Sequence, residues 1–264
     1  MLKSSLLVAG ALVLAPVLTA QESEQKAPAG ISEVAQKIAA VVDAPFECSF
    51  TMNANNEEEG ETIQANGAVV WGTGGKFRFK VHATTSKKDS EVKGEQKFQL
   101  VSDGTTLYMF IDGDQPVTPA GDTKMCMKLP MQMITQGGGA MMGGPQVPQS
   151  KKELENMLGL VEYHLVNKTD AMYSYQIKNM PAGMMMDAPE DLKVMLDLEA
   201  KSFFPKGLNV TAKGMSMALN ATGIKFPKEF KEDTFKFVPP EGVAVQDLSA
   251  MMGGMVPPED DSEF

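Results

Sequence analysis

Two histidines, His82 and His164, are the side chains in this sequence best suited to acid–base or metal chemistry near neutral pH. Each falls on an alternating polar and apolar segment, at a position on the polar side of a predicted strand. The sequence has no Gly-x-Ser-x-Gly, His-Glu-x-x-His or glycine-rich phosphate loop. A nucleophile or base also needs partners that hold and activate it. We therefore expect solvent-facing histidines, no bound cofactor and no enzymatic activity.

The chain is rich in methionine, with 21 residues of this type. Thioether sulfurs can bind copper(I), so the clusters at 184–186 and at Met131 with Met133 make a copper-binding protein one alternative. Cys126 stands between two methionines and is the best candidate ligand, but neighbours in a strand point to opposite faces. Methionine is also unbranched and polarizable, which suits an adaptable apolar lining. We prefer this second interpretation.

The chain has two cysteines, Cys48 and Cys126. In an exported protein they can form a single disulfide bond. Two separate buried thiols are the alternative, and the spacing of the residues leaves both interpretations open.

The first twenty residues have the pattern of a secretory signal peptide. Lys3 makes the start basic, an apolar run extends from Leu6 to Leu18, and Ala20 precedes a polar stretch. The apolar run is shorter than the roughly 20 residues that span a bilayer, so we predict export as a soluble protein. The net charge of −10 argues against nucleic acid and anionic membranes as partners.

The strand pattern is clearest between Gly67 and Ile111, where short apolar segments are separated by Gly, Asp and Ser. Phe77, Phe79 and Val81 share one face of their segment, because strand side chains alternate. Nothing in the order of segments predicts alternating strands and helices. We predict a mainly antiparallel β fold with a few helices, including 31–42 and 153–160, and further strands at 46–52, 124–128, 161–165, 173–177, 194–198, 208–213 and 215–226.

Four segments in this order resemble the LolA-type outer-membrane lipoprotein carriers: Gly67-Ala-Val-Val-Trp71, Lys76-Phe-Arg-Phe79, Val101-Ser-Asp-Gly-Thr-Thr-Leu-Tyr108 and the sequence Phe-Lys-Phe-Val-Pro-Pro-Glu-Gly-Val-Ala-Val at 235–245. The resemblance implies an unclosed half β-barrel with helices over its concave face. It also implies an apolar cavity that shelters acyl chains during transit across the periplasm. The domains expected are a signal peptide at 1–20, a flexible N-terminus at 21–30, a LolA-like half-barrel domain at 31–248 and a disordered acidic tail at 249–264.

The sequence departs from this family in two places, and one of them is the glycine- and methionine-rich insertion from Gln136 to Gly144. Many members carry an Arg just before the Pro or Gly that precedes the Phe-Arg strand, and this Arg ties the lid shut. Alignment on Phe77 puts Thr73 at that position, and Arg78 is the only arginine of this chain. Half-barrels of this kind also occur in RseB-like envelope sensors, where lipid sensing is coupled to a protein partner. A non-catalytic sensor or interaction protein is therefore the main alternative to a carrier.

Strand face and helical position select the apolar residues that would line such a cavity. The expected ligands are acyl chains of lipoproteins or other lipids, with an envelope protein as a further partner, and we expect a monomer. The predicted lining residues are Phe50, Met52, Phe77, Phe79, Val81, Met131, Ile134, Tyr163 and Leu165.

Overall fold

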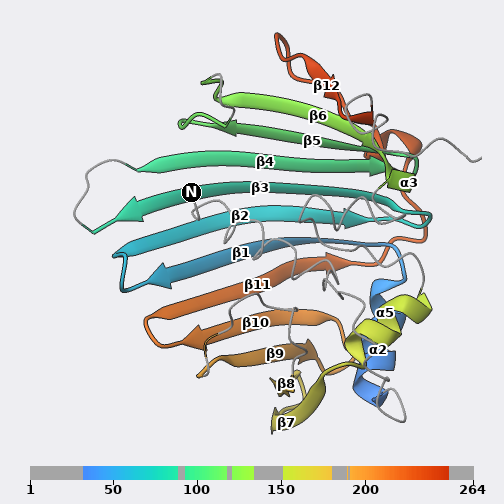
Figure 1. Cartoon of the computed structure of the whole chain (residues 1–264). Coiled ribbons are helices and arrows are strands. Elements are labelled where there is room, and N and C mark those ends of the chain that lie inside the picture. Colours follow the sequence, from blue (N-terminus) through green and yellow to red (C-terminus); the bar gives the residue numbers. More distant parts are fainter. Residues whose placement is uncertain are drawn as a thin grey trace, which may run out of the picture.

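The computed structural model describes residues 32–88, 93–117, 121–133, 151–179, 189 and 191–249. Twelve strands form one sheet in the order β12-β6-β5-β4-β3-β2-β1-β11-β10-β9-β8-β7 (Figure 1). Strands that are neighbours in this order pair antiparallel, except that the short β12 pairs parallel with β6. The two end strands do not pair with each other, so the predicted unclosed, mainly antiparallel half-barrel is confirmed. The signal peptide, the N-terminus at 21–30 and residues 250–264 of the tail lie outside the described residues.

The elements follow the chain in a simple order, and most successive strands are neighbours in the sheet. Their bounds are α2 Glu33–Val42, β1 Phe46–Asn56, β2 Glu61–Trp71, β3 Lys76–Lys87, β4 Gly94–Asp103, β5 Thr106–Gly113, β6 Lys124–Pro130, α3 Met131–Met133, α5 Lys151–Leu158, β7 Glu162–Lys168, β8 Met172–Lys178, β9 Lys193–Glu199, β10 Pro205–Ala212, β11 Met215–Lys225, the 3-10 helix η2 Glu232–Phe235 and β12 Val245–Asp247.

The helix predicted at 31–42 forms as α2, and its start has a local cause. The side chain of Ser32 accepts a hydrogen bond from the Ala35 backbone N–H at 3.1 Å and so caps the N-terminus of the helix. Ile38, Ala39 and Val42 are buried on one face of the helix. The second predicted helix, 153–160, forms as α5 but begins two residues earlier and ends two residues earlier.

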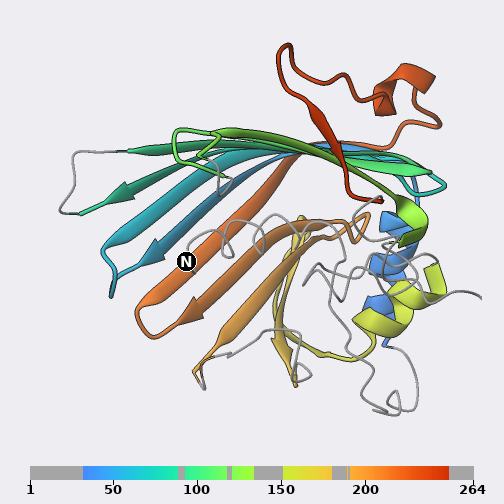
Figure 2. The ribbon, with the colours of Figure 1, turned by 45° about the horizontal axis from the view of Figure 1, so that its top comes forward.

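The sheet has an inner face, against which α2 and α5 lie, and an outer face (Figure 2). Side chains on the inner face of β1, β2 and β3 join those of β8 to β11 and α2 in the main core cluster. Phe50, Leu198 and Leu219 are almost fully buried there. Of the described residues, none from β5 or β6 belongs to this cluster.

The C-terminal segment crosses the outer face instead (Figure 2). Arg78 of β3 donates a hydrogen bond from its guanidinium to the backbone oxygen of Lys236 at 2.8 Å. The ring of Phe237 stacks on Tyr108 of β5, with centroids 5.0 Å apart. Phe235 is buried beside Gly72. The only arginine therefore holds the C-terminal segment on the outer face and does not lie on the inner face.

The strand β12 covers part of the β6 edge. Its residue Asp247 forms an ion pair with Lys128 of β6, with Oδ2 and Nζ 3.0 Å apart, and accepts a hydrogen bond from the Ser249 backbone N–H at 3.0 Å. The Ser249 hydroxyl, the Lys128 ammonium and this backbone N–H, in that order, lower the pKa of Asp247 to about 2.

The attachment of β12 should therefore weaken in acid. The pKa of Asp247 in the folded chain lies below its ordinary value of 3.8, so its contribution is complete above about pH 4 and is lost as the pH falls through about 2. A carboxyl-carbon NMR titration should give the lowered pKa, and the Leu248 amide resonance should shift over the same interval. In Asp247→Asn this shift should disappear. A carboxyl that titrates near 3.8 would contradict the prediction.

Candidate functional site

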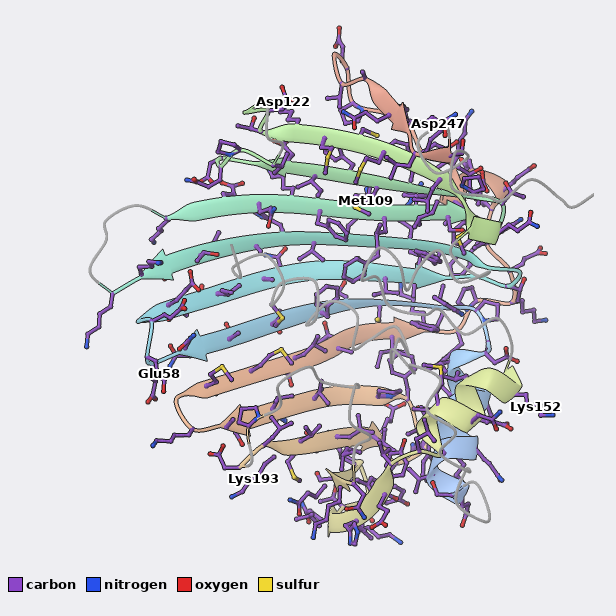
Figure 3. All side chains as sticks on the ribbon, in the orientation of Figure 1. Glu58, Met109, Asp122, Lys152, Lys193 and Asp247 are labelled. Atoms are coloured by element: carbon purple, nitrogen blue, oxygen red, sulfur yellow. The ribbon has the colours of Figure 1, made fainter. Side chains whose placement is uncertain are left out.

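Six apolar side chains form a half-buried surface on the inner face of β4, β5 and β6, which we call the β4–β6 floor. The strand register places them in two cross-strand rows. Leu100 pairs with Met109, which pairs with Met127, and Phe98 pairs with Ile111, which pairs with Met125. All six are neither fully buried nor fully exposed. The floor contains Phe98, Leu100, Met109, Ile111, Met125 and Met127, none of them charged (Figure 3 labels Met109).

Aromatic stacking connects the floor to the main core. Phe50 of β1 stacks on Phe79 of β3 at 5.5 Å between ring centroids, and Phe79 meets Phe98 of the floor edge-on at 6.3 Å. Phe50 can reach across the intervening strand because Gly67 lies between Phe50 and Val81 in the register. A Cβ atom on Gly67 would be 2.4 Å from the Phe50 ring, so the absence of a side chain there is what allows this contact.

The two ends of the floor differ in chemistry. At the end near α3, Leu107, Leu129 and Met131 are buried together and form what we call the corner cluster. At the other end, the next paired residues are Gln96 and Gly113. An elongated apolar ligand lying along β5 would therefore have one end against an apolar group of side chains and the other at a polar boundary.

The structure places the predicted lining residues in three different environments. Phe50, Met52, Phe79 and Val81 are buried in the main core cluster. Met131 belongs to the corner cluster and Phe77 packs against it.

The two predicted lining residues on β7, Tyr163 and Leu165, also lie on the inner face. Tyr163 packs against the main core, and its hydroxyl donates to the Leu158 backbone oxygen at 3.0 Å. Leu165 is 52% exposed. Ile134 lies outside the described residues. That these nine residues line a ligand cavity stays a prediction.

The floor residues are absent from the predicted lining set. Their signal was present in the sequence, because Phe98 and Leu100 alternate with polar residues and Met125 and Met127 share a strand face. Alternation identifies the inner face but does not show which part of that face the helices cover. That distinction depends on how distant elements pack.

The two histidines lie on different strands, each beside a glutamate, and the two cysteines are not bonded to each other. His82 contacts Glu95 at 2.8 Å and His164 contacts Glu162 at 3.1 Å, all with partly exposed side chains. In the described part of the chain, no group of three or more His, Cys, Asp or Glu side chains is arranged to hold a metal ion. Cys126 is buried on the outer face, opposite its two methionine neighbours.

The two thiols are separate, which resolves the alternative left open by the sequence. Cys48 and Cys126 are both free and buried, on β1 and β6, with four strands between them. A spacing of about 4.8 Å per strand puts them roughly 24 Å apart, much farther than a disulfide bond can span. Burial raises the pKa of the Cys48 thiol to about 11, which keeps it protonated near neutral pH.

A pocket lies away from the floor, between β9, β10 and β11. Its volume is about 270 Å³, and Glu199, Lys206 and Phe226 are among the residues that line it. The Lys206 ammonium forms an ion pair with Glu199 at 3.2 Å. This pocket is partly polar and has no continuity with the apolar rows of β4 to β6.

The arrangement defines a class: an open antiparallel half-barrel with an apolar inner face. Solved structures with a similar fold include LprF from Mycobacterium bovis (TM-score 0.40, 11% identity, 74% of this chain and 94% of LprF covered). The LolA superfamily protein NE2245 from Nitrosomonas europaea has a TM-score of 0.31 and 10% identity, with 79% and 98% covered. MucB has a TM-score of 0.38 and 11% identity, with 79% and 62% covered.

The strand order itself confirms the open half-barrel that the resemblance to LolA-type proteins implied. No protein-family model matches the chain, and no curated protein matches it. At these identities the likeness does not extend to a ligand or a partner. None of the helices in the described ranges has the length and apolar character needed to cross a bilayer.

Proposed function

We propose that this chain is an exported binding protein whose inner face shelters an acyl chain of a lipid or lipoprotein during transit across the periplasm. The observation that supports this most directly is the β4–β6 floor, with six uncharged apolar side chains that remain partly accessible. Large contiguous apolar patches on protein surfaces often mark binding sites.

The chemistry of the floor suits a hydrocarbon chain. Burying one CH₂ group contributes about 0.8 kcal/mol, so about ten such groups would contribute about 8 kcal/mol. A free energy of this size corresponds to a dissociation constant on the order of micromolar, before the cost of ordering the ligand. Met109, Met125 and Met127 supply half of the floor, and their flexible thioethers can adjust to chains of different length and branching.

Native mass spectrometry of the protein purified from its own envelope tests this proposal together with a binding titration. We expect a co-purifying acylated molecule, and saturable binding of the fluorescent fatty acid cis-parinaric acid that palmitate displaces. Protein that carries no acylated molecule and binds neither fatty acid would overturn the proposal. A bound copper ion in place of lipid would instead support the copper-binding alternative.

A further inference from the structure

The chain returns to the inner face just after β12. The Leu248 backbone N–H donates to the Lys128 backbone oxygen at 3.0 Å, and the Leu248 side chain packs against the corner cluster. Because β12 runs parallel to β6, it points toward the α3 end of that strand. Residue 249 is therefore beside the corner cluster, at one end of the β4–β6 floor.

The residues that follow are unlike the rest of the C-terminal tail. Residues 250–256 read Ala-Met-Met-Gly-Gly-Met-Val and carry no charge, whereas residues 257–264 contain four acidic side chains. The first five of these residues, Ala-Met-Met-Gly-Gly, also occur at 140–144, a segment that begins nine residues after Met131 of the corner cluster. The chain thus has an uncharged, methionine-rich segment that begins two residues after Leu248, which packs against the corner cluster at one end of the floor.

The length of this segment matches the floor. Seven residues extend up to about 23 Å, while the four residue-to-residue steps from Leu107 to Ile111 of β5 cover about 14 Å at about 3.4 Å per step. Gly253 and Gly254 allow the chain to reverse its direction at low steric cost. A segment tethered so closely has an effective concentration on the order of millimolar at the floor, so even weak apolar contacts can hold it there.

We propose that residues 250–256 occupy the β4–β6 floor when no acyl chain is bound, so that the tail is an intramolecular competitor for the ligand. The effect on ligand affinity rests on the proposed function, whereas the contact itself does not. A ligand must then displace the segment. The apparent dissociation constant of the ligand is therefore its intrinsic value divided by the fraction of molecules whose floor is free.

Substitutions in the full mature chain test the effect on affinity. The triple variant Met251→Asp, Met252→Asp and Met255→Asp should bind cis-parinaric acid about tenfold more tightly than the unchanged protein, because charged side chains disfavour the apolar floor. The matched control neutralises three acidic residues of the distal tail, Asp260→Asn, Asp261→Asn and Glu263→Gln, and should leave the affinity unchanged. Equal affinities for the triple variant and the unchanged protein would count against competition.

A second measurement detects the contact without any ligand. A spin label on Met252→Cys reacts selectively because both native thiols are buried. In the free protein it should broaden the methyl NMR signals of Met109, Met125 and Met127, and saturating palmitate should restore them. No broadening in the free protein overturns the tail contact.

The two measurements separate this inference from the proposed function. If the label broadens these methyl signals but no fatty acid binds, the tail contact stands and the acyl-binding proposal fails. If fatty acid binds equally to all variants and no broadening occurs, acyl binding stands and the tail contact is wrong.

Discussion

Replacing Gly67 by alanine is expected to destabilise the half-barrel by about 3 kcal/mol, the largest effect of a single methyl group that we predict. The added Cβ atom would lie 2.3 Å from the backbone oxygen of Lys80 and 2.4 Å from the Phe50 ring. The Lys80 oxygen belongs to the neighbouring strand β3 and cannot move without disturbing the sheet. The Phe50 ring would also have to leave its stack on Phe79.

Thermal unfolding followed by circular dichroism measures this effect. A loss of about 3 kcal/mol should lower the midpoint of unfolding by roughly 10 °C for a domain of this size. Gly94→Ala is the matched control, since Gly94 is also in a strand and its added Cβ would meet the nearest atom, Thr85 Cβ, at an ordinary 3.7 Å. Equal midpoints for the two variants would show that the space above Gly67 does not constrain the fold.

Replacing Met109 by aspartate should remove most of the acyl binding. Met109 is central in the floor, because it is paired with Leu100 on one side and Met127 on the other. A carboxylate at this position would have to lose its hydration when an acyl chain covers it. We expect the affinity for cis-parinaric acid to fall at least tenfold, which corresponds to about 1.4 kcal/mol.

The control for this variant is Met195→Asp. Met195 is also half-buried in a strand, but its register partners Asn209 and Gln176 place it on the outer face. Both variants add one negative charge at a methionine, so only the face of the sheet differs. Unfolding midpoints should be measured for both, so that a loss of binding is compared between folded proteins. Unchanged affinity in Met109→Asp, or an equal loss in Met195→Asp, would contradict binding at the floor.

Much of the local structure could be predicted from the sequence. The helix at 31–42 forms, with Ser32 as its N-cap, and Phe77, Phe79 and Val81 share the inner face as their alternation indicates. The strands predicted at 208–213 and 215–226 form as β10 and β11, and Gly214 between them has a positive φ. These features depend on neighbouring residues, whose spacing and backbone preferences are encoded locally.

Other features depend on residues far apart in the chain. The contact of Phe50 with Phe79 requires that β1, β2 and β3 be aligned so that Gly67 lies between them. The course of the C-terminal segment over the outer face requires Arg78 to meet Lys236, 158 positions later in the sequence. Neither pairing has a local signal.

The sequence alone therefore determined the strands, their two faces and the apolar character of one face. Only the tertiary structure decided which part of that face is accessible, because α2 and α5 pack near β1 and β8–β11 and leave the β4–β6 floor half-buried. The physical reason is that alternation fixes the direction of each side chain within its own strand, whereas burial depends on which distant elements come to lie above it.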